Sequence, residues 1–268
     1  MKTHDMFFPY TSSKFSANKA VLHHTKEYDL LNLFFANLEH GIYIDVGGNV
    51  PSNAVSTPFH AKGWAGVLVE PIPENAARFR ETGWTNVKEV AVTSPAKAKL
   101  GTTQFFLAGG DTAPHSSLEK NQIDPNSLQI EETIVVNLTT LQNICDEHQI
   151  THINLLSIDT EGTELDVLQG LNFETTTVDL ILCEDWQRDS LIHRYLVAQG
   201  YKVILRTGFN SWYIPRRIAS DTTALGKLKL WKKIYVSSHI KRLRHWISVT
   251  RNQKSMTDPE SLGRQPNN

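Results

Sequence analysis

Residues 42–51 read Ile-Tyr-Ile-Asp-Val-Gly-Gly-Asn-Val-Pro. The apolar first half is typical of a short buried strand, and the glycines that follow indicate a tight turn toward a helix. Short apolar runs, among them the expected strands 65–70, 87–92, 152–158 and 178–183, continue to alternate with helical periodicity as far as residue 215. This alternation predicts a doubly wound α/β fold, in which helices cover both faces of a mostly parallel sheet. Residues 201–214 predict a closing hairpin, which would add one antiparallel strand.

The composition excludes several classes of protein. The chain has 268 residues, of which 21% are charged, and two cysteines. These values argue against a disordered chain and against a disulfide-rich fold. No run approaches the roughly 20 apolar residues that a membrane-spanning helix needs, and residues 1–10 lack the apolar core of a signal peptide. We therefore expect a cytoplasmic protein.

Charge is distributed unevenly along the chain. The whole chain holds 27 basic and 28 acidic side chains, whereas residues 216–268 hold 12 basic and 3 acidic ones. Such an imbalance predicts that the C-terminal part has a partner of its own. We expect an irregular N-terminal segment at 1–25, an α/β domain at 26–215 and a basic amphipathic helical tail at 216–268.

Residues 216–254 of this tail combine basic side chains with an apolar stripe at Leu225, Leu228, Trp231 and Tyr235. A basic amphipathic helix that carries tryptophan is typical of binding to an anionic membrane surface. A helix packed on its own domain or in a dimer is the alternative. We expect no nucleic-acid partner, because no recognised motif accompanies the charge. If the tail does bind lipid, the protein would lie on the inner face of a membrane.

Candidate site residues fall where the predicted strands end. In an open α/β sheet, ligands bind beyond the carboxyl ends of the strands, near the point where the strand order switches. Five groups lie at such ends: Asp45 to Asn49, Glu70-Pro71, Ala91-Val92, Asp159 to Glu161, and Glu184-Asp185.

The first of these loops is not the G-x-G-x-x-G fingerprint of dinucleotide-binding proteins, because no third glycine follows Gly48. Asp45 at its head favours a ligand with a cationic group. Glu70 follows the next strand, where a carboxylate can accept hydrogen bonds from the two hydroxyls of a ribose. Together these features predict an adenosine cofactor and do not separate NAD from S-adenosylmethionine.

The segment Ser157 to Gly170, Ser-Ile-Asp-Thr-Glu-Gly-Thr-Glu-Leu-Asp-Val-Leu-Gln-Gly, is the most specific stretch of the chain. With its Asp-x-Glu-Gly-x-Glu element followed by Val-Leu-x-Gly, it resembles the FkbM family of S-adenosylmethionine-dependent methyltransferases. The family's first loop, Asp-Val-Gly-Ala-Asn, matches Asp45 to Asn49 except at Gly48, and its Val-Glu-Pro matches Val69 to Pro71. A second departure is Pro51, where many members have glycine. The resemblance covers about residues 41–215.

This resemblance implies a class I methyltransferase sheet, which is Rossmann-like, and S-adenosylmethionine as the cofactor. It also implies O-methylation of a hydroxyl on a sugar, glycan or related metabolite. The residues that it implies for cofactor binding are Asp45, Gly47, Gly48 and Asn49 at the aminoacyl part, Glu70 with Pro71 at the ribose, and Val92 at the adenine.

Four acids are candidates for the chemical step, and their role stays open at the level of sequence. Asp159, Glu161, Glu184 or Asp185 could accept the proton of an acceptor hydroxyl. Asp159, Glu184 and Asp185 could instead hold a Mg²⁺ ion that lowers the pKa of that hydroxyl. In-line positioning without either device is the third alternative. His115, with Ser116 and Ser117, either faces the acceptor or belongs to an ordinary loop.

Two other functions remain as competing hypotheses. One is a non-catalytic module that brings a glycan-assembly complex to a membrane through the basic tail. The other is an NAD-dependent oxidoreductase on the same scaffold, against which the missing third glycine and the Asp-x-Glu-Gly element both argue.

Overall fold

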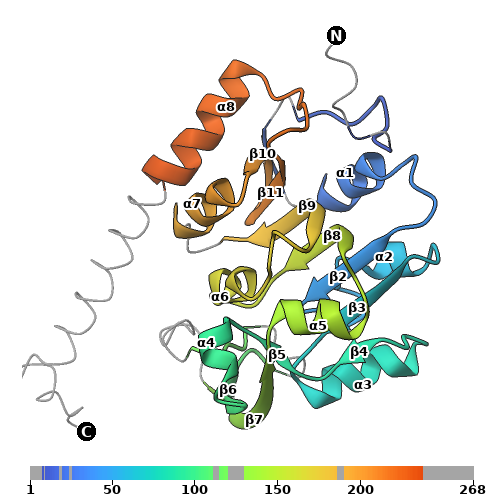
Figure 1. Cartoon of the computed structure of the whole chain (residues 1–268), viewed down its shortest axis with the longest axis vertical. Helices are drawn as coiled ribbons and strands as arrows, with labels where there is room; N and C mark the ends of the chain where they lie inside the picture. The colour runs from blue at the N-terminus through green and yellow to red at the C-terminus, as the bar shows by residue number, and fades with distance from the viewer. Residues whose placement is uncertain are drawn as a thin grey trace, which may run out of the picture.

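The computed structural model shows one large sheet with helices on both of its faces (Figure 1). The residues that it describes are 8, 10–17, 20–23, 26–110, 115–119, 130–185 and 190–237. Most of the predicted tail, residues 238–268, lies outside this range, as does much of the predicted N-terminal segment.

The large sheet has eight strands in the order β1-β10-β11-β9-β8-β2-β3-β4. Their bounds are β1 Val21–Leu22, β2 Ile42–Val46, β3 Ala65–Val69, β4 Val87–Lys88, β8 His152–Ile158, β9 Thr177–Glu184, β10 Tyr201–Thr207 and β11 Asn210–Pro215. From β2 the chain adds β3 and β4 on one side, and it later adds β8 and β9 on the other. The strand order therefore switches between β2 and β8.

The predicted mixed α/β sheet is confirmed, including its antiparallel strand. The pairs β2–β3, β2–β8 and β8–β9 are parallel. Strand β11 pairs antiparallel with both β9 and β10, so it lies inside the sheet and not at its edge. The last strand of the hairpin, β11, is thus inserted between β9 and β10, which both precede it in the sequence.

Helices cover the sheet in two layers. Helices α1 (Glu27–Phe34), α2 (Thr57–His60) and α3 (Pro73–Glu81) contribute to one apolar core, and α5 (Leu141–Glu147), α6 (Glu164–Gln169) and α7 (Ser190–Ala198) contribute to the other. Successive strand residues pack into the two cores in turn. Tyr43 and Leu155 pack into the core of α1 to α3, whereas Ile44 and Leu156 pack into the core of α5 to α7. This alternation explains why the central strands are apolar at nearly every position.

A second, three-stranded sheet stands beside the first and has the order β5-β7-β6, with β5 at Ala91–Val92, β6 at Thr102–Leu107 and β7 at Glu132–Thr139. The sequence predicts one strand over 87–92, and the structure corrects this prediction. Residues 87–88 pair with β3 in the large sheet, whereas residues 91–92 pair with β7. The change of partner at Glu89 and Val90 turns the chain toward the second sheet, and the short helix α4 (Pro95–Ala98) follows.

Helix α8 (Ala224–Trp231) follows β11 and continues as a π-helical stretch, η4, over Lys232–Ser237. It packs against β10 and β1 at the edge of the large sheet (Figure 1). Among the residues that the structure describes, no helix combines the length and apolar character needed to cross a bilayer.

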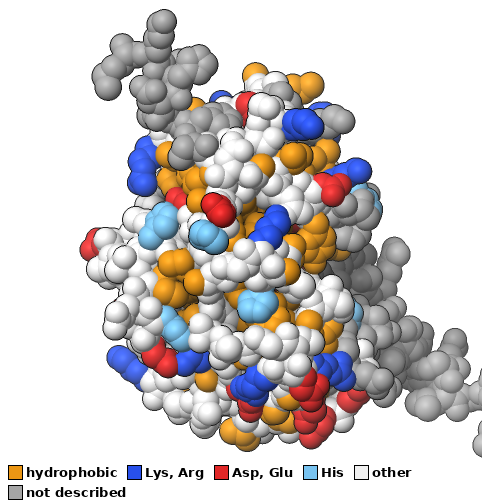
Figure 2. All heavy atoms as spheres, turned by 90° about the vertical axis from the view of Figure 1, so that its right-hand side faces the viewer, with side chains coloured by type: hydrophobic (Ala, Val, Ile, Leu, Met, Phe, Trp, Pro, Cys, Tyr) orange, Lys and Arg blue, Asp and Glu red, His pale blue; other side chains and the backbone are white. Residues whose placement is uncertain are grey.

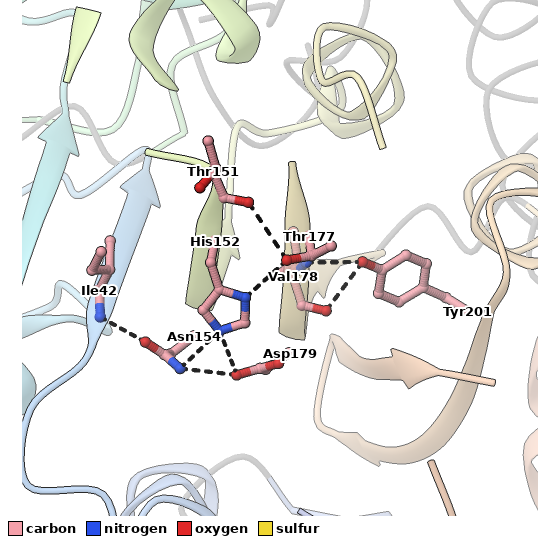
Figure 3. Close-up of polar contacts among 8 residues, drawn as sticks. All are labelled: Ile42, Thr151, His152, Asn154, Thr177, Val178, Asp179 and Tyr201. Carbon is pink, nitrogen blue, oxygen red and sulfur yellow. Dashed lines mark hydrogen bonds and ion pairs between the residues drawn. The ribbon is translucent and has the colours of Figure 1, made fainter. Parts of the chain in front are cut away.

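The amino ends of the central strands are joined by a polar network (Figure 3). His152 Nε2 lies 3.0 Å from Asp179 Oδ2, and Asn154 Nδ2 donates to the same carboxylate oxygen. Asn154 Oδ1 in turn accepts a hydrogen bond from the backbone N–H of Ile42. The network therefore connects β2, β8 and β9 at the sheet edge where each of these strands begins.

Candidate active site

A pocket lies at the carboxyl ends of β2, β3 and β8, where the strand order switches. It is the place where ligands bind in open α/β sheets. Its lining residues are Val46, Gly47, Asn49, Val69, Glu70, Pro71, Ile72, Val90, Ala91, Val92, Phe105, Ser116, Leu118, Asp159, Thr160, Glu161 and Thr163. Most of the residues predicted from the ends of these strands are therefore brought together.

Gly47 brings the first loop against the loop that follows β8. Its φ angle is +87°, in the region that favours glycine, and its N–H donates to the carbonyl oxygen of Val69 over 2.9 Å. A Cβ atom at this position would lie 1.7 Å from the carbonyl oxygen of Asp159. Only glycine fits here, because any side chain would push the two loops apart.

Glu70 lines the pocket and also ties two backbone segments together. Its carboxylate accepts hydrogen bonds from the N–H of Asn49 over 2.7 Å and from that of Ile72 over 2.9 Å. The residue is only 3% exposed. Burial raises the pKa of Glu70 to about 7, although both hydrogen bonds act in the opposite direction. Glu70 thus holds the loop of Asn49 in place beside the pocket.

Two of the predicted cofactor residues do not line the pocket. The buried carboxylate of Asp45 accepts hydrogen bonds from the N–H and the hydroxyl of Ser56, over 2.9 and 2.6 Å. Gly48 faces the core instead, since a Cβ atom there would lie 2.6 Å from Leu68 Cδ1. Both residues therefore face away from the pocket and shape the loop from behind.

The loop after β8 is held in a strained conformation. Glu161 has a φ angle of +53°, which is uncommon for a residue other than glycine, and Gly162 follows at +106°. The buried carboxylate of Glu164 accepts hydrogen bonds from the N–H of Thr160 over 3.1 Å and from that of Gly162 over 2.8 Å. Backbone strain that its surroundings enforce in this way is typical of functional sites. Here it orients the side chain of Glu161.

Three acids converge at the floor of this site. Ligand oxygens of Asp159, Glu161 and Glu184 all lie within 4.8 Å of one another. The side chain of Asp159 is open to the pocket on one side and enclosed by protein on the others. A group in that position meets solvent but still loses much of its hydration.

Burial and mutual repulsion raise the pKa values of these acids. Burial, and then the charge of Glu161, raises the pKa of Asp159 to about 7. Burial, and then Glu164, raises the pKa of Glu161 to about 7. Burial, and then the charges of Asp159 and Glu161, raise the pKa of Glu184 as well. Each of the three acids therefore holds its proton more tightly than an isolated carboxyl group does.

Asp185 does not belong to this cluster, although the sequence predicts it there. Its carboxylate lies 3.3 Å from Nη1 of Arg206, and its carbonyl oxygen accepts from Nη2 of the same arginine over 2.8 Å. Both side chains are buried. The β10–β11 hairpin delivers Arg206 beside Asp185, which makes the acid half of a buried ion pair.

The comparison with known families agrees with this geometry. A family model described as the methyltransferase FkbM domain matches residues 45–203, which run from the end of β2 into β10. The chain belongs to the FkbM methyltransferase family. The resemblance predicted from the first loop and from Ser157 to Gly170 is thereby confirmed. No curated protein matched the chain in a sequence search.

The acids of this FkbM domain have the chemistry to hold a metal ion. Asp159, Glu161 and Glu184 offer carboxylate oxygens, which are the ligands that Mg²⁺ prefers in proteins. The sequence predicts a set with Asp185 in the place of Glu161, and the ion pair with Arg206 explains the difference.

A segment at 115–119 of the FkbM protein closes one side of the site. His115 Nδ1 lies 3.4 Å from Glu161 Oε1, and the Ser117 hydroxyl donates to the carbonyl oxygen of Glu161 over 3.0 Å. Ser116 lines the pocket. His115 is therefore placed beside a candidate base, which favours the interpretation that this loop faces the acceptor.

Sequence reasoning missed several lining residues: Ile72, Phe105, Leu118 and Thr163. Ile72 directly follows the predicted Glu70-Pro71, and Thr163 lies two residues beyond Glu161, so a wider window at each strand end would have included them. Phe105 and Leu118 come from the second sheet and the segment after it. No local pattern in the sequence indicates that the second sheet lies beside the first. The contribution of Phe105 and Leu118 to the pocket therefore cannot be predicted from the sequence.

Proposed function

We propose that the protein is an S-adenosylmethionine-dependent O-methyltransferase that acts on a hydroxyl of a sugar, glycan or related metabolite. The observation that carries the proposal is the charge of the pocket. Glu70, Asp159 and Glu161 line it, and no lysine, arginine or histidine is among the described residues that do so. Such a pocket favours a cationic ligand, and the ammonium and sulfonium groups of S-adenosylmethionine are cations.

The other walls of the pocket fit the remaining parts of this cofactor. Gly47 and Asn49 bring backbone groups close to the cavity, as a bound aminoacyl group requires. The oxygens of Glu70 have room for further hydrogen bonds from ribose hydroxyls, because each oxygen accepts one backbone bond and can accept another. The apolar side chains of Ile72, Val92 and Phe105 form a surface suited to an adenine ring.

The architecture supports the same proposal. Counted along the chain from β2, the large sheet follows the 3-2-1-4-5-6 order of doubly wound nucleotide-binding folds, with β11 inserted between the fifth and sixth strands and β1 added beyond the sixth. We infer from this order that the domain is a class I, Rossmann-like methyltransferase domain.

NAD is a poorer match to the site. Its pyrophosphate is anionic, so it would meet the three carboxylates with repulsion. The phosphate cradle of NAD enzymes also uses a third glycine, which the first loop lacks. An oxidoreductase function is disfavoured for both reasons.

Glu161 is the residue that we assign as general base. Bound S-adenosylmethionine would supply an electrophilic methyl group for the acceptor oxygen, with the sulfur as leaving group. Glu161 accepts the proton that the acceptor hydroxyl loses. A pKa of about 7 suits a base that works near neutral pH. His115, at 3.4 Å, can take the proton on toward solvent.

Asp159 and Glu184 support this step in one of two ways. Without metal, the carboxylate of Asp159 adds negative charge next to the cationic cofactor. With Mg²⁺, the two residues and Glu161 would hold the ion, which would lower the pKa of the acceptor hydroxyl in place of proton abstraction by a free Glu161. Comparing turnover in EDTA with turnover after addition of Mg²⁺ separates the two arrangements.

Calorimetric titration of the protein with S-adenosylmethionine and with NAD tests the cofactor. We expect binding of S-adenosylmethionine, and weaker binding after Asp159→Asn because one carboxylate is neutralised. Tight binding of NAD together with none of S-adenosylmethionine would contradict the proposal. If the cofactor binds and no sugar or glycan hydroxyl is methylated in a mass-spectrometric screen, the catalytic half fails and a non-catalytic module becomes the better hypothesis.

A further inference from the structure

Helix α8 presents an apolar stripe to solvent. Leu225, Leu228 and Trp231 are 62%, 58% and 54% exposed, and they succeed one another at intervals of three residues. Side chains at this spacing lie on one face of a helix. Tyr235 extends the stripe into η4, where its ring centroid lies 6.1 Å from that of Trp231. Large apolar side chains gathered in this way on one exposed helix indicate an interaction surface.

The opposite face attaches α8 to the domain. Leu230 and Ile234 are 2% and 5% exposed, and Gly226 is buried as well. These residues hold the helix against the edge of the large sheet at β10 and β1 (Figure 1). Because this face already anchors the helix, the stripe is not needed to keep α8 in place.

Lysines accompany the stripe. An α-helix turns by about 100° per residue, so Lys227 lies on one flank of the stripe and Lys229 on the other, and both are exposed. Lys232 and Lys233 follow at the C-terminal end of the helix. The sequence from residue 222 to residue 254 contains no acidic residue. The apolar face is thus bordered by charge of a single sign.

The positive charge extends onto the neighbouring strand β10. Burial, and then the charges of Lys227 and Arg216, lower the pKa of Lys202. Arg217, next to Arg216 after β11, is also exposed. By contrast, acidic and basic side chains are interspersed on the face that Figure 2 shows. On that face the two signs are mixed, whereas Lys202 and Arg216 beside α8 and Lys227 within it are all basic.

These features discriminate among the surfaces that α8 could meet. A second copy of the chain would bring lysines against lysines, which is unfavourable. A nucleic acid would use the lysines, but its phosphates would leave Leu225, Leu228 and Trp231 without a partner. A bilayer that contains anionic lipid offers phosphates and carboxylates at its surface and an apolar layer just below them. It is the surface that complements both parts of α8.

We propose that α8 binds the surface of an anionic membrane. Leu225, Leu228 and Trp231 enter the boundary between headgroups and acyl chains, where tryptophan is favoured. Lys227, Lys229, Lys232 and Lys233 lie at the level of the lipid phosphates. The buried face of α8 stays on the domain, so the whole α/β body is carried to the membrane.

Co-sedimentation of the full-length protein with lipid vesicles tests this proposal. We expect binding to vesicles of phosphatidylcholine with phosphatidylserine, little binding to phosphatidylcholine alone, and weaker binding as salt rises. The double variant Leu225→Ser/Leu228→Ser should lose at least about tenfold in affinity, because two apolar side chains no longer enter the lipid. Lys227→Gln/Lys229→Gln should lose about tenfold or more, since two charges are removed.

Matched controls use residues of the same type and exposure elsewhere. Leu100→Ser changes a leucine that is 71% exposed and outside α8, and Lys99→Gln changes an exposed lysine next to it. Both should bind vesicles like the unchanged protein. Equal binding by Leu225→Ser/Leu228→Ser and the unchanged protein would overturn the proposal. So would a dimer that this variant dissociates, or binding to single-stranded DNA that excludes vesicles and is unaffected by the leucine changes.

Discussion

Acidic side chains lie at both ends of the strand pair β8–β9, and the surroundings of these acids differ. At the amino ends, Asp179 has His152 and Asn154 as partners (Figure 3). At the carboxyl ends, Asp159, Glu161 and Glu184 face one another. In the described part of the chain, His115 is the only basic side chain within 4.0 Å of a carboxylate oxygen of these three.

This difference distinguishes acids that stabilise the fold from acids that are available to a ligand. An acid with hydrogen-bonding partners on neighbouring strands stabilises the sheet. Acids that repel one another in a partly buried site reduce stability, as their raised pKa values indicate, and a cationic ligand or a metal ion would relieve the repulsion. The amino ends therefore serve stability, and we propose that the carboxyl ends serve binding and chemistry.

The largest effect on cofactor binding and stability is expected from Gly47→Ala, which changes a loop at the carboxyl ends of the strands. The new Cβ would lie 1.7 Å from the carbonyl oxygen of Asp159, at a φ angle unsuited to alanine. Calorimetry should detect no binding of S-adenosylmethionine, and the free energy of unfolding should fall by about 4 kcal/mol or more. Gly48→Ala is the control. Its Cβ meets the end of the flexible Leu68 side chain, so binding should persist at a cost of about 1–2 kcal/mol in stability.

Replacing Glu161 by Gln tests the proposed base. Methyl transfer should fall by about 10²–10⁴-fold, because the amide cannot accept a proton, while the affinity for S-adenosylmethionine changes much less. In the unchanged protein, kcat/KM should rise as pH increases through about 7, since Glu161 acts only when it has lost its proton. A rate that survives in Glu161→Gln with the same pH profile would assign the base elsewhere.

Substitutions of Glu164 test whether the strained loop depends on the hydrogen bonds that this residue accepts. In Glu164→Ala the N–H groups of Thr160 and Gly162 lose their acceptor, so Glu161 should shift and kcat should fall by about tenfold to a hundredfold. Glu164→Gln keeps an acceptor oxygen and should recover most of this loss. If both variants lose kcat equally, the charge of Glu164 matters and its hydrogen bonds do not.

Asp179→Ala tests the amino ends. It leaves His152 and Asn154 without the carboxylate that joins them, and the free energy of unfolding measured with urea should fall by about 1–3 kcal/mol. The kcat value should stay unchanged, because the network lies at the opposite end of the strands from the pocket. A loss of kcat in a folded Asp179→Ala protein would contradict the division between the two ends.

The last prediction concerns how the free energy of unfolding depends on pH, and its effect is expected at alkaline pH. Glu161 has a pKa of about 7 in the folded protein against 4.5 for an unperturbed glutamate, so the folded state binds its proton more tightly. Its contribution therefore favours folding at low pH and is lost as pH rises from about 4.5 to about 7. Glu161→Gln should be more stable than the unchanged protein by roughly 1–3 kcal/mol at alkaline pH. Urea unfolding at acidic pH should show a much smaller difference.

The sequence predicts the framework well where a pattern is local. The strands Ile42–Val46 and His152–Ile158 have the predicted bounds, because each is rich in apolar residues and is followed at once by a glycine or polar turn. The run at 87–92 is interpreted wrongly as one strand. Its apolar character is the same whether the chain continues in one sheet or changes to another, as it does here.

The sequence predicts which strand ends form the site, but it does not predict which way each side chain points. Asp159, Glu161 and Glu70 reach the pocket as predicted, since the carboxyl ends of parallel strands meet at one edge. Asp45 instead bonds to Ser56, and Asp185 pairs with Arg206. Each of these partners is brought in by tertiary structure, namely the turn before α2 and the register of the β10–β11 hairpin, for which the sequence has no local signal.

The contact between Gly47 and the carbonyl oxygen of Asp159 joins two positions that lie far apart along the chain. The first loop cannot take its final shape until β8 has paired with β2, because the second half of the contact comes from the end of β8. During synthesis, a nascent polypeptide that stops short of residue 159 would hold the first loop but lack the second half of the contact. Ligand binding by a longer nascent chain would thus indicate that the central sheet is complete.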